Sequence, residues 1–247
     1  AMIGDLQKFE IENCVGRDGQ SLNLILEKYG INFNNYIFAA RKKEEIKAYI
    51  ELHIEQGPIL EKNLKDIGVV DSIVGLLTSE FFFFGEANHA GTTPVLNRQD
   101  ALKATSEMIT TCFKELKIDL IKGVRLTYGK LEVSPGASNV VPSLSRGYQE
   151  IRAESFTEMD RIYKKTIEIA NEIALKNNVK FESKIFARDD PELMSESITS
   201  IISSVCRNNK YSLLHMKSGA CHDAQVMARH CKSGLIFIPS CNGVSHS

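Results

Sequence analysis

The segment ELHIEQGPIL, residues 51–60, contains the features from which the fold of the chain is best inferred. Apolar residues alternate with Glu51, His53 and Glu55, and this period of two predicts a β-strand with one apolar and one polar face. The Gln-Gly-Pro triplet then ends the strand, because Gly allows unusual dihedrals and Pro has no N–H to donate. An imidazole at a strand end, pointing away from the core beside carboxylates, suits a metal ligand or a general base. The alternative is an exposed polar face with an incidental histidine.

The composition is that of a globular protein, and 247 residues suffice for one large domain or two ordinary ones. With 43% hydrophobic residues, 25% charged residues and a formal net charge of −1, no global field favours nucleic acid or an anionic membrane. The sequence contains no apolar run of membrane-spanning length and no signal-peptide pattern, which predicts a cytoplasmic location. The six cysteines form no C-x-x-C pair and are expected to be reduced thiols.

The hydrophobic pattern predicts two kinds of architecture along the chain. One region has the order strand, helix, strand, strand, helix, strand, which is typical of a ferredoxin-like split βαβ layer, with strands at 81–85, 124–133, 147–153 and 180–186 and helices at 98–116 and 159–176. Four adjacent Phe residues in the first of these strands cannot all face one core, so one side should meet another surface, such as a second subunit. The flanking segments have α/β character, with helices at 18–30, 191–206 and 222–230, a strand at 48–54, one or two buried strands at 67–77 and a buried parallel strand at 235–239. We therefore expect two domains, the first discontinuous in sequence.

Polar clusters at predicted strand ends and in loops are the candidates for a site. They are His53 with Glu55 and Gln56, the segment NHAGTTP at 88–94, the segment PGASN at 135–139 with Arg152, and the segment CHD at 221–223 with His246. No G-x-S-x-G elbow, P-loop or G-x-G-x-x-G fingerprint occurs, and basic residues are not clustered with aromatic ones. A nucleophilic pair of Cys221 and His222 is disfavoured, because neighbours on a helix diverge. Metal-assisted hydrolysis is the class of chemistry that fits best.

Five longer segments carry a resemblance to a known family: ELHIEQGPILE at 51–61, GEANHAGTTPVLNRQDAL at 85–102, VSPGASNVVP at 133–142, SGACHDAQVMA at 218–228 and GLIFIPSCNGVSHS at 234–247. Through them the chain resembles the N-carbamoyl-L-amino acid amidohydrolase, allantoate amidohydrolase and β-ureidopropionase family, within the metal-dependent aminoacylase and carboxypeptidase superfamily. The segments stand in family order over nearly the whole chain. Motifs of this length are far more specific than the spacing arguments above.

The resemblance implies an α/β metallopeptidase-like, metal-binding domain at 2–76 and 189–247, with an inserted ferredoxin-like α+β lid and dimerisation domain at 77–188. It implies a homodimer formed through the lid and a small ureido or carboxylate substrate, with no nucleic-acid or membrane partner. The reaction would be hydrolysis of a C–N bond in a ureido or carbamoyl group by a hydroxide bridging two divalent metals, zinc or manganese. His53 and His246 match ligands of two different metals.

The resemblance also assigns roles in binding and catalysis. His89 matches the lid histidine that reaches the active site of the partner subunit and stabilises the developing oxyanion. Asn139 and Arg152 match the pair that holds the substrate, with the guanidinium gripping its carboxylate. Gln56 is expected to line the substrate pocket.

Departures from the family pattern bear on activity. The family's H-x-D motif, bridging Asp and Glu-Glu pair precede the first matching segment and do not occur in this sequence, and Cys221 and Glu150 replace a family Gly and Asp. Two of five protein ligands remain, and the general base is absent, so metal should bind poorly or not at all and hydrolysis by this chain alone should be weak or absent. We expect an N-terminally truncated member of the family. The alternatives are the C-terminal part of a split hydrolase completed in trans by a separate N-terminal catalytic fragment, and a non-enzymatic module that binds carboxylates or dimerises.

Overall fold

Strand β1 (Ala48–Ile54) forms where the alternating sequence predicts it and pairs in parallel with β9 (Lys232–Ile238). Both lie in a five-stranded sheet of order β1-β9-β2-β7, in which β2 (Ile67–Ile73) is antiparallel to β9 and also pairs with β8 (Leu213–Ser218). The mixed sheet confirms the predicted α/β class and the predicted parallel strand near the carboxyl end. Strand β8 and the two-residue strand β7 (Glu192–Leu193) were not predicted from the sequence.

Helix α7 (Glu196–Asn208) covers part of this sheet through Ile198, Ile202 and Cys206, which pack on Val69. It begins later than the predicted helix at 191–206, because the residues before it form β7. The other described helices in the segments before β2 and after β8 are short: α2 (Leu22–Lys28), η1 (Phe33–Ala39), η2 (Lys43–Glu45), α3 (Ile59–Lys62), α8 (Asp223–Ala228) and η4 (Cys241–Gly243). Ser21 caps α2 as predicted, and α2 buries no residue.

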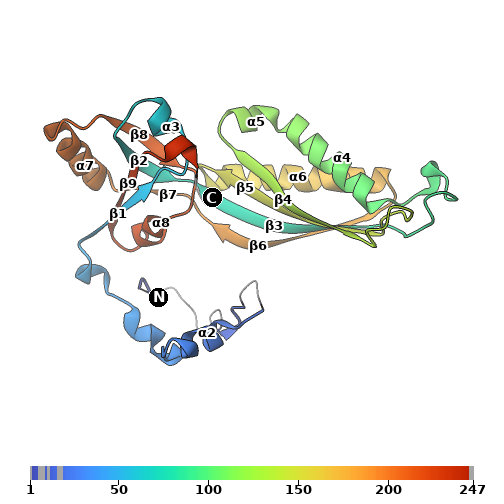
Figure 1. Cartoon of the computed structure of the whole chain (residues 1–247), viewed down its shortest axis with the longest axis horizontal. Helices are drawn as coiled ribbons and strands as arrows, with labels where there is room; N and C mark the ends of the chain where they lie inside the picture. The colour runs from blue at the N-terminus through green and yellow to red at the C-terminus, as the bar shows by residue number, and fades with distance from the viewer. Residues whose placement is uncertain (1, 5–8, 10–11, 16–18, 245–247) are drawn as a thin grey trace. The chain divides into compact units, whose positions relative to one another are not determined.

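The second sheet has the order β4-β5-β3-β6, and its neighbouring strands are antiparallel (Figure 1). Its elements follow the predicted sequence of strand, helix, strand, strand, helix, strand: β3 (Gly75–Phe84), α4 (Ala101–Glu115), β4 (Arg125–Ser134), β5 (Leu144–Ala153), α6 (Phe156–Lys176) and β6 (Lys180–Asp189). Two short helices, η3 (Val95–Asn97) and α5 (Lys117–Ile121), lie in the connections. This order and pairing are those of a split βαβ layer.

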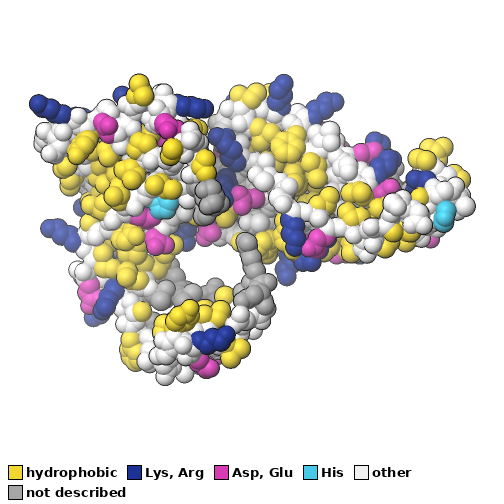
Figure 2. Space-filling view, in the orientation of Figure 1, with side chains coloured by type: hydrophobic (Ala, Val, Ile, Leu, Met, Phe, Trp, Pro, Cys, Tyr) yellow, Lys and Arg dark blue, Asp and Glu magenta, His cyan; other side chains and the backbone are white. Residues whose placement is uncertain are grey.

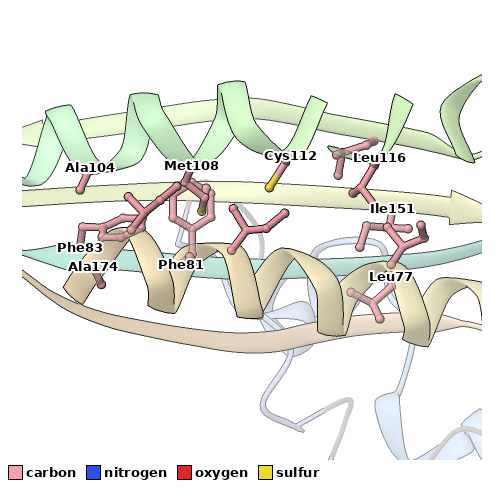
Figure 3. Close-up of a cluster of buried hydrophobic side chains, with 14 of the residues drawn as sticks. Leu77, Phe81, Phe83, Ala104, Met108, Cys112, Leu116, Ile151 and Ala174 are labelled. Atoms are coloured by element: carbon pink, nitrogen blue, oxygen red, sulfur yellow. The ribbon is translucent and has the colours of Figure 1, made fainter. Parts of the chain in front are cut away.

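The core of the second sheet lies between its strands and helices α4 and α6 (Figure 3). Phe81 and Phe83 point into this core with exposed fractions of 3% and 0%. Phe82 and Phe84 lie on the other face, where their rings stack with centroids 5.9 Å apart. The four Phe residues therefore do not share one core, as the sequence predicted.

The structure describes residues 2–4, 9, 12–15 and 19–244 of the computed structural model. The chain divides into two compact units. Unit 1 comprises Ala1–Asp71, Leu193–Met216 and His222–Ser247, and unit 2 comprises Ser72–Glu192 and Lys217–Cys221. Among the described residues, no helix has the length and apolar character required to cross a bilayer.

Candidate active site

The alternation along β1 places Glu51 and His53 on one face of the strand, both half-buried. From the sequence we expected this face to point away from the core, and that expectation was wrong. The apolar residues of the other face are the more exposed ones, because α8 contacts β1 and covers the polar side. His53 lies beside Phe237 of β9 in the parallel register.

His222 joins Glu51 and His53 from a distant part of the sequence. It occupies the N-cap position of α8 and is 8% exposed. Its ring meets that of His53 edge to face at 4.8 Å and lies 5.3 Å from the ring of Phe237. Its Nδ1 is 3.4 Å from Glu51 Oε1, and Glu51 Oε2 accepts a 2.7 Å hydrogen bond from the backbone N–H of Ala224. One carboxylate thus holds both the imidazole and the first turn of α8.

The electrostatics of this cluster follow from its burial. Desolvation lowers the pKa of His222, and His53 adds to the effect, while the carboxylate of Glu51 acts in the opposite direction. Burial raises the pKa of Tyr49, with Glu51 and Asp223 adding to the shift. The cluster therefore favours a neutral imidazole at position 222.

The hydrogen bonding of His53 prepares one ring nitrogen for a ligand. Nδ1 lies 2.8 Å from the carbonyl oxygen of Ile54, which can only accept a hydrogen bond. Nδ1 therefore carries the proton in the neutral ring, and Nε2 keeps its lone pair. A backbone carbonyl on one imidazole nitrogen is the usual support for metal binding through the other.

The described residues do not complete a metal site around His53. Within residues 2–4, 9, 12–15 and 19–244, no group of three or more His, Cys, Asp or Glu side chains is placed to hold an ion. His246, the other predicted ligand, lies outside the described residues. Among the residues that the structure describes, His53 thus offers a suitable imidazole without a completed shell of ligands around it.

Glu55 has a structural role and does not extend the polar face. It is 8% exposed, and its two carboxylate oxygens accept hydrogen bonds from the backbone N–H groups of Ile59 and Leu60 at 2.7 and 2.8 Å. These donors belong to the first turn of α3, which a carboxylate stabilises. Gln56 follows with a positive φ of 58° and donates its backbone N–H to Ser240 Oγ at 2.9 Å. The Glu-Gln-Gly-Pro turn therefore fixes where β1 ends and brings Gln56 next to the loop after β9.

His89 and Asn139 lie in neighbouring loops of unit 2. The backbone N–H of Ala90 donates to the carbonyl of Asn139 at 2.9 Å, and His89 forms an isolated bridge with Val140. His89 Nδ1 accepts a 3.1 Å hydrogen bond from the N–H of Gly91, where a Cβ atom would come within 3.2 Å of the ring. In the neutral ring Nε2 therefore carries the proton, and the exposed His89 presents a hydrogen-bond donor.

Arg152 lies near the carboxyl end of β5, and two nitrogens of its guanidinium donate hydrogen bonds within unit 2. Its Nε donates to Glu150 Oε1 and its Nη1 to the carbonyl of Gly219, both at 2.7 Å. Five donors are available on a guanidinium, so others remain for an anion. Near this group, desolvation raises the pKa of the Cys221 thiol, although Arg152 acts against the shift. That thiol is a poor nucleophile at neutral pH.

The structure brings some predicted site residues together and separates others. His53 and Gln56 share the end of β1, and His89 lies beside Asn139. Asn139 precedes the first residue of β5, Leu144, whereas Arg152 lies eight residues further along, which is roughly 26 Å at the usual rise of a strand. Figure 1 shows the loops after β3 and β4 at one end of the second sheet and the end of β5 at the other. Asn139 and Arg152 therefore cannot grip the same small substrate within one copy of unit 2.

From the sequence, Glu51 shares the polar face of the strand with His53 and His222 belongs to a candidate cluster, but neither was predicted to contact His53 or was assigned a role. The signal for Glu51 was its alternation with His53, which predicts one shared face. For His222, the segment CHDA was noted, but no spacing rule relates it to a strand about 170 residues earlier.

The chain is similar to known proteins in both sequence and fold. Residues 19–247 match the family described as peptidase family M20/M25/M40. The chain is 34% identical to the N-carbamoyl-L-amino acid amidohydrolase of Geobacillus stearothermophilus, over 100% of this chain and 60% of that protein. It is 33% identical to the allantoate amidohydrolase of Bacillus subtilis, over 94% of this chain and 56% of that protein.

A solved structure extends the similarity to the fold. The crystal structure of AtUAH in complex with (S)-hydroxyglycine superposes with a TM-score of 0.88 at 31% identity, covering 100% of this chain and 60% of that one. The chain spans about 60% of the length of the relatives it matches. The family match and the identity over the whole chain place the protein in peptidase family M20/M25/M40, among relatives named as N-carbamoyl-L-amino acid and allantoate amidohydrolases.

Proposed function

We propose that this chain takes part in the hydrolysis of a C–N bond in a small ureido or N-carbamoyl substrate that carries a carboxylate. The observation that carries the proposal is the end of β1, where the hydrogen bond at Nδ1 of His53 leaves the lone pair of Nε2 for a ligand and the ring packs against His222, which Glu51 contacts. The names of the relatives, which are hydrolases of N-carbamoyl amino acids, allantoate and ureidoglycolate, support the substrate class. Because the chain spans about 60% of their length, the complete activity belongs to the proposal.

We assign His53 as one ligand of a divalent metal, zinc or manganese, in a dinuclear centre that His246 helps to complete. When bound, such ions polarise a carbonyl and lower the pKa of water. The donor set of the described residues fits a single ligand and not a full shell, so no step of the reaction is assigned to the metal in this chain by itself. Hydrolysis by this chain alone should accordingly be weak or absent.

We assign substrate positioning to unit 2, as a lid and dimerisation domain. Arg152 would grip the substrate carboxylate with its remaining donors, and the Nε2–H of His89 would stabilise the oxyanion that forms on the attacked carbonyl, with Asn139 beside it. The separation of Asn139 from Arg152 along β5 supports a homodimer, because His89 and Asn139 of one copy can then serve the substrate held by Arg152 of the other.

The deciding experiment combines metal titration by calorimetry with turnover assays on an N-carbamoyl amino acid, allantoate and ureidoglycolate. We expect His53→Ala to remove the metal binding that the wild-type chain retains. His215→Ala, a matched change at a histidine paired with Asp71 on β2, should leave it unaltered. Tight binding of two metals with full turnover by the chain alone would refute the expectation that its hydrolysis is weak or absent. Metal binding that survives His53→Ala would refute the assigned ligand.

A further inference from the structure

The loop that carries His89 connects β3 to α4, and we call residues 85–100 the His89 loop. Its two ends lie against each other. The backbone N–H of Glu86 donates to the carbonyl of Gln99 at 2.9 Å, and the same carbonyl leaves no room for a Cβ atom on Gly85. Figure 2 shows a histidine exposed at this end of unit 2. The loop is thus closed at its base and presents its imidazole at the surface.

Arg98 lies in the last part of the His89 loop and donates back into the first part. Its Nε is 3.0 Å from the carbonyl oxygen of Thr93, and its Nη2 is 2.5 Å from the carbonyl oxygen of Ala90. The residue is half-buried, and among the described residues no carboxylate forms an ion pair with it. Its charge therefore acts on the two carbonyls, and hydrogen bonds from a charged donor are stronger than those between neutral groups.

The contact with Ala90 connects Arg98 to the imidazole through one peptide group. The carbonyl of Ala90 and the N–H of Gly91 belong to the same peptide, and this N–H donates to His89 Nδ1 at 3.1 Å. A charged donor on the carbonyl polarises the peptide, so that its N–H becomes a better donor. The guanidinium, the peptide and the imidazole therefore form a chain of two hydrogen bonds that ends on Nδ1.

The contact with Thr93 holds the backbone of His89. The backbone N–H groups of Thr92 and Thr93 donate to the carbonyl of His89 at 3.2 and 3.1 Å. Arg98 binds the carbonyl of Thr93, so the guanidinium braces the turn that these bonds form. Gly91 allows the ring to approach, because a Cβ atom there would lie 3.2 Å from the Cε1 atom of His89. Both the ring and its backbone are thus held relative to Arg98.

We propose that Arg98 is the positioning residue of His89, whose guanidinium fixes the imidazole as the Nε2–H tautomer through the Ala90–Gly91 peptide. This role rests on the proposed function, in which the Nε2–H group stabilises the developing oxyanion. Such a donor is effective only when it is in place before the charge develops. A ring with its proton on Nδ1 would instead present a lone pair to the oxyanion. Arg98 itself needs no contact with the substrate.

Closure of the loop does not depend on Arg98. The backbone N–H of Val141 donates to the carbonyl of Asn88 at 2.8 Å, and that of Ala90 donates to the carbonyl of Asn139 at 2.9 Å. These bonds tie the loop to the segment before β5 without the guanidinium. What Arg98 adds is the polarised peptide next to the ring and the bracing of the turn.

The test is ¹⁵N NMR of the His89 imidazole in the whole chain at mildly alkaline pH. The unaltered chain should show the Nε2–H tautomer and a scalar coupling between Nδ1 and the backbone nitrogen of Gly91. In Arg98→Ala the share of the Nδ1–H tautomer should rise about fivefold, as expected when a hydrogen bond of ordinary strength is lost, and the coupling should weaken. Arg125→Ala is the matched control, because Arg125 also donates to two backbone carbonyls of unit 2. It should alter neither signal.

The positioning role is overturned if the tautomer and the coupling are unchanged in Arg98→Ala or change equally in Arg125→Ala. Fast amide exchange at Ala90 and Val141 would show that the loop has opened in Arg98→Ala. Arg98→Lys then decides, because it keeps a cation near the carbonyl of Ala90. We expect it to close the loop and to retain most of the Nε2–H tautomer. A closed loop with the tautomer ratio of Arg98→Ala overturns the proposal, and so does a loop that opens in both variants.

Turnover assays separate the positioning of His89 from the proposed function. The NMR signals need no substrate, so a ring that depends on Arg98 in a chain that hydrolyses no N-carbamoyl amino acid supports the positioning and removes the proposed function. Where hydrolysis is detected, Arg98→Ala should lower kcat about tenfold and leave KM unchanged, as expected of a group that acts in the transition state. An unchanged kcat beside a freed ring supports the positioning and refutes the oxyanion role of His89.

Discussion

The rings of His53 and His222 meet edge to face at 4.8 Å, although 169 positions separate them in the sequence. This contact, with Glu51 hydrogen-bonded to the first turn of α8, connects the end of β1 to a helix that follows much later in the chain. The orientation of the His53 ring therefore depends on two different elements. It is set by the carbonyl of Ile54 on one side and by His222 on the other.

Replacing His222 by Ala should destabilise unit 1. The side chain of His222 is almost fully buried between His53 and Phe237, so its removal leaves a cavity and costs about 2 to 4 kcal/mol of unfolding free energy. Urea denaturation measures this loss, and the ¹⁵N shifts of the His53 imidazole report the freed ring. The matched change His215→Ala, at a half-exposed pair with Asp71, should cost less than about 1 kcal/mol. Equal losses for the two variants would contradict the packing role of His222.

Glu55 should matter for folding more than for substrate. Glu55→Ala leaves the N–H groups of Ile59 and Leu60 without their carboxylate acceptor, in a buried position, which should cost about 2 to 3 kcal/mol. Glu55→Gln keeps one acceptor oxygen and should cost less. Glu61→Ala, at an exposed carboxylate in the same helix, is the control. If urea denaturation ranks Glu61→Ala with Glu55→Ala, Glu55 does not cap α3.

The carboxylate of Glu150 should compete with an anionic ligand for Arg152. Glu150→Gln removes a negative charge that lies 2.7 Å from Arg152 Nε, so N-carbamoylglycine should bind about fivefold more tightly. Binding is followed through the Nε–H signal of Arg152 in NMR titrations. Arg152→Ala should abolish saturable binding. Glu154→Gln, at a neighbouring carboxylate paired with Lys217, should change little, and an equal gain there would show that only net charge matters.

The sequence was sufficient for unit 2, where long amphipathic patterns set α4, α6 and their strands through local periodicity. It was insufficient for the faces of β1. Alternation defines two faces, but which of them is buried depends on α8, whose position follows from tertiary packing. The sequence pattern was also insufficient for β5, because its predicted start at residue 147 was three residues late. The full length of this strand is what separates Asn139 from Arg152. A buried thiol in the well-predicted core gives a further test.

Unit 2 should lose stability as the pH rises above about 9. Burial raises the pKa of Cys112 to about 11, from 9.0 for an ordinary thiol, and burial also raises the pKa of Tyr128 beside it. Between the two thiol pKa values, 9.0 and about 11, the unfolded chain releases the thiol proton of Cys112 and the folded chain keeps it. The free energy of unfolding therefore falls by up to about 1.4 kcal/mol per pH unit in this range. Below pH 9 the thiol is protonated in both states and has no effect.

Urea denaturation followed by circular dichroism from pH 8 to 11 measures this slope. Cys112→Ala should flatten it, because the group that titrates is gone. Met108→Ala, which shortens a neighbouring side chain in the same core, should lower stability at every pH and leave the slope intact. A slope that survives in Cys112→Ala but disappears in Tyr128→Phe would assign the alkaline loss to the phenol and not to the thiol.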